Sequence, residues 1–180
     1  MDASNRKPDD ALRLILLRHA KSAWPEGVAD RRRPLSERGR RAAPAIGGYM
    51  KREGLLPDLV LVSTAERTQQ TWALVKPELS HDPEIRNLDA IYEAPAERRL
   101  ATLGQTEPGC RCVAMIGHNP GMEDLAAMLT GGGNPQARQA MAEKYPTAGL
   151  AVIDFNCAVW QDIAPGAGRL ERFVTPRSLG

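Results

Sequence analysis

Short apolar runs alternate with amphipathic stretches along most of this chain. The runs are as long as single strands and carry few polar residues, which predicts strands buried on both faces. They cover residues 12–17, 58–62, 85–88, 111–117, 148–155 and 170–174. The stretches between them have the apolar spacing of helices, at 37–53, 67–79, 96–103 and 119–129. This alternation predicts an α/β fold, a three-layer α/β/α sandwich with a mostly parallel central sheet.

Glycine, proline and capping residues divide the pattern into elements. Ser36 is a plausible N-cap of the first helix, and Gly54 follows its end as a C-cap. Gly47-Gly48 inside this helix either weakens it or marks close packing against a neighbour. Pro77 should bend or end the second helix. The glycines of residues 131–134 predict a flexible loop rather than a domain boundary.

Length and composition indicate one ordinary globular domain. We assign residues 12–180 to that domain and residues 1–11 to a disordered polar segment. Hydrophobic residues make up 42% and charged residues 26%, and the net charge of +2 is too small to indicate nucleic acid. We find no signal peptide and no transmembrane span, so we expect no membrane partner and, by default, a cytoplasmic location. No pattern indicates the oligomeric state.

The cysteines give little support to a metal site. An odd count of three, Cys110, Cys112 and Cys157, predicts reduced thiols in a chain without export signals. Cys110 and Cys112 are followed by His118, but a structural zinc site would need a fourth ligand at suitable spacing. We therefore expect small thiols around a strand, and neither metal nor cofactor.

Two of the three histidines follow apolar runs and stand among residues that bind phosphate. His19 comes directly after Arg18, and a neutral imidazole can act as nucleophile, base or metal ligand. The planar Arg18 guanidinium suits phosphate oxygens because it donates two parallel hydrogen bonds. His118 lies in Gly117-His118-Asn119-Pro120-Gly121. Alone, the first pair could be a surface loop, and His118 a capping or core histidine.

A third segment, Ser63–Thr71, also follows an apolar run and opens a helix. A helix N-terminus attracts anions, and Arg67 adds a full positive charge in the first turn. A cation is mildly unfavourable there, so its presence indicates a nearby anion, although a solvated surface arginine is the alternative. Parallel strands place their carboxyl ends at one edge, so Arg18, His19, Arg67 and His118 are predicted to meet there.

Together these motifs resemble those of the histidine phosphatase superfamily, the phosphoglycerate-mutase-like enzymes, and most of all its SixA-type phosphohistidine phosphatase branch. The resemblance covers about residues 12–155. The matching segments are Leu17-Arg18-His19-Ala20 (Ala replaces Gly of the family's RHG signature), Arg33-Pro34-Leu35 with Gly39, Ser63–Thr71, Gly117–Gly121 and Tyr145-Pro146-Thr147-Ala148. It implies a phosphoglycerate-mutase-like fold and a metal-independent enzyme in which His19 becomes phosphorylated. Arg18, Arg67 and His118 would surround the phosphoryl oxygens.

The resemblance leaves the general acid open. Some family members place an acidic residue after the second histidine, where this chain has Asn119. Others use a glutamate between the second and third motifs, for which Glu93 is the best candidate. An exposed glutamate at a helix start is an equal alternative. Imidazole leaves phosphorus with less proton donation than an alkoxide does. Whether Glu93 acts as a general acid therefore also affects which substrate is expected.

Residues after the first motif are further candidates for substrate contact. We expect Ser22 and Lys21 to contact the phosphate. Arg31 and Arg32 are interpreted as a solvated face that also steers anions. Trp24 either walls the pocket or packs on the body of the protein.

The sequence therefore predicts a phosphatase for a phosphomonoester or phosphoramidate, and the resemblance points to phosphohistidine on a protein. The expected partner is a phosphorylated protein or a small phosphorylated substrate. One alternative is a phosphatase for a sugar phosphate or nucleotide. Another is a phosphate- or phosphoprotein-binding module without turnover. A third is a metal hydrolase that uses His19, His118 and the Cys110/Cys112 pair.

Overall fold

The computed structural model describes residues 11–180. The predicted disordered segment 1–11 lies, except for its last residue, outside the described residues, and the single domain over 12–180 stays a prediction. The strands of the described part are β1 (Leu12–Arg18), β2 (Leu59–Ser63), β3 (Glu84–Leu88), β4 (Cys112–Gly117), β5 (Thr130–Gly133), β6 (Leu150–Phe155) and β7 (Gly168–Val174). The α-helices are α1 (Glu37–Arg52), α2 (Glu66–Val75), α3 (Ala96–Gly104), α4 (Gly121–Leu129), α5 (Pro135–Glu143) and α6 (Pro176–Leu179). None of these helices has both the length and the apolar character needed to cross a bilayer.

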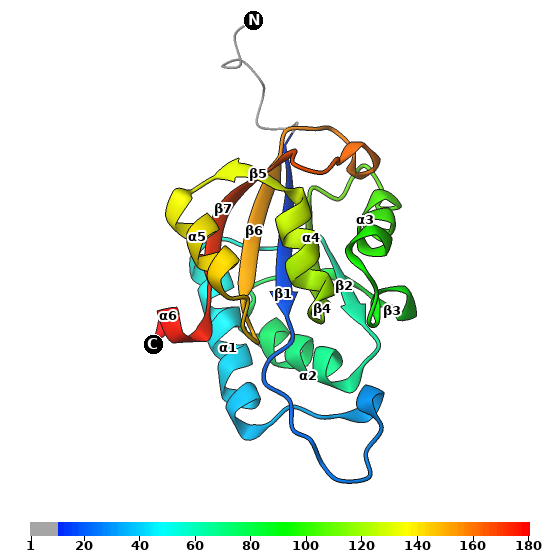
Figure 1. Cartoon of the computed structure of the whole chain (residues 1–180), viewed down its shortest axis with the longest axis vertical. Helices are drawn as coiled ribbons and strands as arrows, with labels where there is room; N and C mark the ends of the chain where they lie inside the picture. The colour runs from blue at the N-terminus through cyan, green and yellow to red at the C-terminus, as the bar shows by residue number, and fades with distance from the viewer. Residues whose placement is uncertain (1–10) are drawn as a thin grey trace, which may run out of the picture.

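The strands form one seven-stranded sheet in the order β3-β2-β4-β1-β6-β7-β5. β1, β4, β2 and β3 are parallel to one another, and β5 is parallel to β7. β6 runs antiparallel to both β1 and β7. The prediction of a mostly parallel sheet is confirmed. Because β1, β2 and β4 run in the same direction, their carboxyl ends lie at one edge of the sheet (Figure 1).

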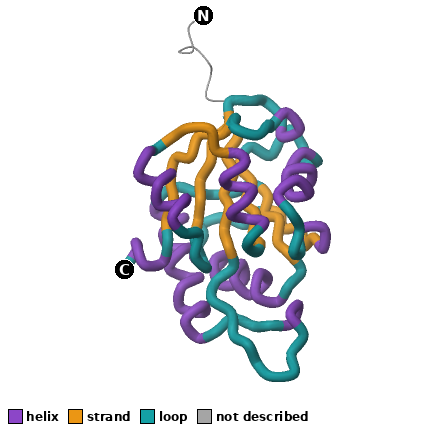
Figure 2. The backbone as a smooth tube through the Cα atoms, viewed as in Figure 1, coloured by secondary structure: helices purple, strands orange, loops and turns teal. Residues whose placement is uncertain are grey.

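Alternating side chains of the central strand build a core on each face of the sheet. Leu14 and Leu16 pack with residues of α3, α4 and α5 on one face. Ile15 and Leu17 pack with residues of α1 and α2 on the other. This alternation follows from the two-residue period of a strand. It confirms the three-layer sandwich, and Figure 2 shows the strands enclosed between helices.

The first helix matches its predicted boundaries. The Ser36 hydroxyl accepts a hydrogen bond from the backbone N–H of Gly39 at 3.2 Å, as expected of an N-cap. Gly54 follows the helix end with φ of 67°, a left-handed conformation that favours glycine. A β-carbon on Gly47 would lie 2.7 Å from the Val75 carbonyl oxygen. Gly47 therefore marks close packing of α1 against the end of α2.

The prediction for the glycine-rich region is wrong. Residues 130–133 form β5, a short strand paired with β7, and not a flexible loop. A β-carbon on Gly131 would lie 1.9 Å from the Gly166 carbonyl oxygen, so glycine permits a close backbone approach there. The sequence pattern also missed α5, which Asn134 caps by accepting from the Ala137 N–H at 3.0 Å.

As predicted, α2 stops before Pro77, and a short 3₁₀ turn follows over Lys76–Glu78.

Candidate active site

One cavity of about 320 Å³ lies at the sheet edge where β1 and β4 end. It is lined by every residue that the sequence proposed for catalysis or substrate binding, namely Arg18, His19, Lys21, Ser22, Arg67, Glu93 and His118. Trp24, Asp30, Arg33, Asn119 and Thr147 complete the lining. The side chains that follow the three strands thus lie at one cavity, as the sequence analysis predicted from the common direction of the strands.

His19 is held as a neutral imidazole with one free nitrogen. Its backbone N–H donates to the Gly117 carbonyl at 3.0 Å, which ties the end of β1 to the end of β4. Its ring Nδ1 lies 2.7 Å from the Ala20 carbonyl oxygen. A carbonyl only accepts, so Nδ1 carries the proton and Nε2 keeps its lone pair. Burial is the main cause that lowers the pKa of His19 to about 4; the bond to Ala20 opposes this shift, and the charges of Arg67 and Arg18 add to it.

His118 lies beside His19, with 5.4 Å between the ring centroids. Its Nε2 is 2.7 Å from the Ser63 hydroxyl oxygen at the end of β2. Burial is the main cause that lowers the pKa of His118 to about 2, followed by the neighbouring His19 and Arg67. The two imidazoles are therefore neutral at pH 7, and His118 is a cavity residue rather than a cap or core histidine.

The two predicted phosphate-binding arginines are held differently. Arg18, at the end of β1, donates from Nη1 to the Tyr145 carbonyl at 2.9 Å. Arg67, in the first turn of α2, is only 4% exposed, so its interpretation as a solvated surface residue is wrong. Its Nη1 donates to the Asp30 carbonyl at 2.8 Å and its Nη2 to the Asp30 carboxylate at 3.1 Å. The fork of Arg67 is thus engaged by an acidic residue of the cavity.

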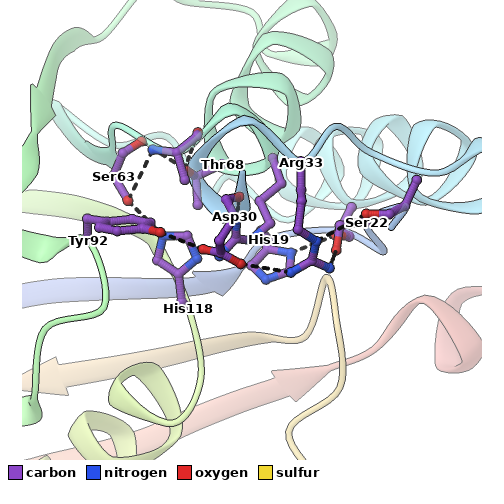
Figure 3. Close-up of polar contacts among 12 residues, drawn as sticks. His19, Ser22, Asp30, Arg33, Ser63, Thr68, Tyr92 and His118 are labelled. Atoms are coloured by element: carbon purple, nitrogen blue, oxygen red, sulfur yellow. Dashed lines mark hydrogen bonds and ion pairs between the residues drawn. The ribbon is translucent and has the colours of Figure 1, made fainter. Parts of the chain in front are cut away.

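Asp30 is the main site residue that the sequence analysis missed. Its carboxylate lies at the centre of the polar network in Figure 3 and accepts from Tyr92 Oη and from the guanidinium groups of Arg33 and Arg67. The hydrogen bond from Tyr92 is the largest cause that lowers the pKa of Asp30, with further lowering by Arg33 and Arg67. Asp30 is therefore ionised and fixes both arginines. It stands in a polar loop without periodicity, so no sequence signal separated it from its neighbours.

Arg33 is a second buried cation of the cavity. Its Nη2 donates to the Ser22 hydroxyl at 2.6 Å, and its guanidinium carbon lies 3.1 Å from the centroid of the Trp24 ring. Ser22 therefore lines the cavity with its oxygen accepting from Arg33 (Figure 3). Trp24 is 77% exposed and walls the pocket, which was one of its two expected roles. Arg33 belongs to one of the segments that match the family, but the sequence analysis did not propose it as a site residue.

Arg31 and Lys21 lie at the exposed margin of this region. The Arg31 guanidinium donates to the Asp89 carboxylate at 2.6 Å and lies 4.3 Å from the centroid of the Tyr92 ring. Arg32 is exposed, in agreement with the predicted solvated face. The exposed Lys21 side chain lines the cavity, while its backbone carbonyl accepts from Ser36.

Glu93 lines the cavity from the turn before α3 and is exposed. Its φ of 48° is a left-handed conformation that non-glycine residues rarely adopt. The next carbonyl, of Ala94, accepts from Arg99 Nε at 2.9 Å, and Arg99 Nη2 also reaches the His118 carbonyl at 3.3 Å. Arg99 is fully buried, and burial lowers its pKa to about 10. It therefore connects the turn that carries Glu93 to the turn that carries His118.

The glycines that flank His118 leave room for this buried arginine. A β-carbon on Gly117 would lie 2.3 Å from Arg99 Nη1, and one on Gly121 would lie 2.5 Å from Arg99 Nε. Arg99 itself lay in a stretch interpreted as an ordinary amphipathic helix, so its role could not be found from the pattern.

Three buried nitrogens of the cavity residues have no hydrogen-bond partner within residues 11–180. They are Arg18 Nε, Arg67 Nε and His118 Nδ1. A buried donor without an acceptor costs roughly 1–3 kcal/mol. An oxyanion is the ligand that suits a cavity with four cationic side chains and unsatisfied donors. This chemistry fits a phosphoryl group.

The predicted alternative of a metal site built from both histidines and the cysteine pair is wrong. Cys112 begins β4 and His118 follows its end, so about 20 Å of extended chain separates them at roughly 3.3 Å per residue. Within residues 11–180, no group of three or more His, Cys, Asp or Glu side chains is arranged to hold a metal ion.

Comparison with known proteins agrees with this site. Residues 14–96 match the family model described as histidine phosphatase superfamily, branch 1. An uncharacterized protein of Mycobacterium tuberculosis is 34% identical over 89% of this chain and all of its own length. The chain belongs to the histidine phosphatase superfamily.

Solved structures of relatives have the same fold. A protein of Agrobacterium tumefaciens with the provisional name phosphohistidine phosphatase SixA is 34% identical, with a TM-score of 0.76 over 92% of this chain and 98% of that one. One of Nakamurella multipartitia with the same provisional name is 28% identical, with a TM-score of 0.77 over 94% of this chain and 99% of that one. These likenesses support a hydrolase that acts on phosphoryl groups.

Proposed function

We propose that this protein hydrolyses phosphohistidine on a protein substrate through a covalent phosphohistidine at His19. The observation that carries the proposal is the state of His19. Its Nδ1 proton is donated to the Ala20 carbonyl, so the lone pair remains on Nε2. The ring lines a cavity that arginine side chains also line. Nucleophilic attack on phosphorus requires this neutral tautomer.

The neighbouring side chains supply the charge that phosphoryl transfer needs. In the proposed reaction Nε2 of His19 attacks phosphorus, and the bond from phosphorus to the leaving group breaks. Arg18 and His118 bind the equatorial oxygens, and Arg67 and Arg33 add positive charge from positions fixed by Asp30. Water then attacks the phosphohistidine and releases inorganic phosphate. Positioning and charge stabilisation provide most of the catalysis in such a step, so the proposed enzyme works without a metal.

Glu93 is the proposed general acid for substrates whose leaving group needs a proton. Asp30 is the other acidic residue of the cavity lining, and its hydrogen bonds keep it ionised. The place of Glu93 in the cavity favours a second candidate function, hydrolysis of a phosphomonoester of a small metabolite. A phosphorylated imidazole needs less proton donation than an alkoxide when it leaves phosphorus. Removal of Glu93 should therefore slow the hydrolysis of a phosphomonoester more than the hydrolysis of phosphohistidine.

A protein substrate can reach the cavity because part of its lining is exposed. Lys21, Trp24 and Glu93 are all exposed at its margin. The SixA names of the two solved relatives support the same substrate class. We place the reaction in the cytoplasm.

The decisive experiment is mass spectrometry of the protein after brief mixing with phosphoramidate and quenching at high pH. We expect an acid-labile phosphoryl adduct on the peptide that contains His19, and none in His19→Ala. His81→Ala is the matched control, because His81 lies outside the cavity and its Nε2 pairs with the Pro57 carbonyl. Absence of both adduct and released phosphate would instead favour a binding module without turnover.

A further inference from the structure

A second cavity adjoins the first on the side of α1, α5 and α6. Its volume is about 330 Å³, and Lys21 and Thr147 line both cavities. In Figure 1, α6 lies beside α1 near the carboxyl ends of β1 and β4, at the end of the molecule that carries the active site. We call this second cavity the basic groove. Its cationic residues are Lys21, Arg38, Lys144 and Arg177.

These four cations have no acidic partner among residues 11–180. None of them forms an ion pair within the described part of the chain. Glu143 is the acidic residue of the groove, and its carboxylate accepts from Gln139 at 3.2 Å. The groove lining carries four cationic residues and one acidic residue, whereas the whole chain has a net charge of only +2, so the groove concentrates positive charge beside the active site. Such a concentration attracts and orients an anionic partner.

The floor of the groove is apolar. Ala42, Ala140, Pro146 and Phe173 contribute to the lining. The Phe173 ring packs edge-on against the Tyr145 ring at 5.0 Å between centroids. An apolar floor with a cationic margin suits an extended polypeptide that carries both acidic and apolar side chains. A small inorganic anion would instead require donors that converge, and no hydrogen bond within residues 11–180 orders these four side chains toward a common point.

We propose that the basic groove binds an acidic segment of the protein substrate next to its phosphorylated residue. The proposal rests on the proposed function, because the shared Lys21 and Thr147 place the segment beside the phosphoryl group that His19 attacks. The groove thereby selects phosphoproteins whose modified side chain is flanked by Asp or Glu.

The test compares three fluorescein-labelled peptides that share apolar residues and a central histidine. Their flanks carry Glu, Gln or Lys. Fluorescence anisotropy measures Kd for the unphosphorylated forms, and phosphate release measures kcat/KM for the phosphohistidine forms. We expect the Glu peptide to bind at least tenfold more tightly than the Gln peptide at 50 mM salt, and the difference to shrink at 300 mM because surface charges are screened. The kcat/KM values should follow the same order.

Charge reversal identifies the groove as the source of this preference. The double variant Arg38→Glu/Lys144→Glu should lose the tenfold preference, while hydrolysis of p-nitrophenyl phosphate changes less than twofold. The matched control is Arg40→Glu/Arg98→Glu, which changes the net charge equally outside the groove. Arg40 lies two residues from Arg38 on α1, about 200° around the helix, and all four residues are exposed. Circular dichroism checks the fold of each variant.

The outcomes separate this proposal from the proposed function. Equal Kd values for the three peptides, or equal losses in both double variants, overturn the groove even if p-nitrophenyl phosphate is hydrolysed. Binding of tripolyphosphate as tight as that of the Glu peptide, with the same loss in Arg38→Glu/Lys144→Glu, overturns the peptide assignment. A preference for the Glu peptide without any phosphoryl adduct supports the groove and overturns the proposed catalysis.

Discussion

At the scale of single residues, the cavity depends on how its charged side chains are paired. Asp30 binds both terminal nitrogens of Arg67 through its carbonyl and carboxylate, and it also holds Arg33. His19 and His118 are neutral because burial opposes their protonation. The site therefore combines fixed positive charge from guanidinium groups with an imidazole that is free to act as a nucleophile.

Replacing Arg67 with Lys should lower kcat/KM for p-nitrophenyl phosphate by about tenfold or more. An ammonium is a point charge and cannot make the two bonds that the Arg67 fork makes to Asp30. Steady-state kinetics measures the effect, and Arg40→Lys on exposed helix surface is the control. Unchanged kinetics for Arg67→Lys would show that the Asp30–Arg67 pair has no part in catalysis.

The low pKa of His19 predicts how its ring titrates. The imidazole should remain neutral from pH 8 down to about pH 5 and become protonated with a midpoint near 4. Side-chain NMR with ¹⁵N-labelled histidine follows this midpoint, with His19→Gln to assign the signal. A midpoint near the ordinary value of 6.5 would contradict the buried, neutral state.

The same shift makes stability depend on pH in a known direction. Between pH 6.5 and 4 the unfolded His19 binds a proton that the folded one does not, so folding stability falls as pH decreases through this window. The slope is at most about 1.4 kcal/mol per pH unit for one histidine. Urea unfolding at several pH values should show a smaller slope for His19→Gln than for the wild type. Equal slopes would contradict the assignment.

At the scale of elements, close contacts between helices decide where glycine is required. Gly47 and Gly48 are adjacent in α1, yet only Gly47 faces α2. A β-carbon on Gly47 would lie 2.7 Å from the Val75 carbonyl oxygen, whereas one on Gly48 would lie 3.5 Å from the flexible end of Arg52. The sequence offered close packing as one of two interpretations of this pair, and it could not say which glycine was involved.

The two substitutions to alanine should therefore have opposite effects on stability. Gly48→Ala should stabilise the protein by roughly 0.5–1 kcal/mol, because alanine has the higher helix propensity. Gly47→Ala should destabilise it by roughly 1–3 kcal/mol, because backbone must move to admit the methyl group. Urea unfolding measures both, and each variant serves as the control for the other. Equal effects would contradict the α1–α2 contact.

At the scale of the whole molecule, the parallel strands gather the site at one end and leave the cysteines at the other. Arg18 and Gly117 are paired neighbours at the carboxyl ends of β1 and β4, while Arg13 pairs with Cys112 near their beginnings. The loop between β1 and α1 extends beyond the sheet below β1 in Figure 1 and supplies Ser22, Asp30 and Arg33 to the cavity. Cys112 therefore lies at the opposite end of its strand from the cavity residues.

A chelator should leave the phosphatase activity unchanged. Activity on p-nitrophenyl phosphate after incubation with EDTA is expected to stay within about twofold of the untreated rate, because the proposed step uses only side chains of the protein and water. The double variant Cys110→Ser/Cys112→Ser should also retain activity. Loss of activity in EDTA, with recovery on addition of a divalent metal, would contradict the proposed metal-independent mechanism.

The sequence by itself determined the alternation of buried strands and helices, and with it the sheet edge where Arg18, His19, Arg67 and His118 meet. These features follow from local periodicity and from the common direction of parallel strands. Tertiary structure alone decided the places of Asp30, Arg33 and Arg99. Asp30 and Arg33 lie on a polar loop whose path is fixed by contacts with α2 and Tyr92, and Arg99 is buried against an irregular turn. Such contacts join distant positions and leave no periodic signal in the chain.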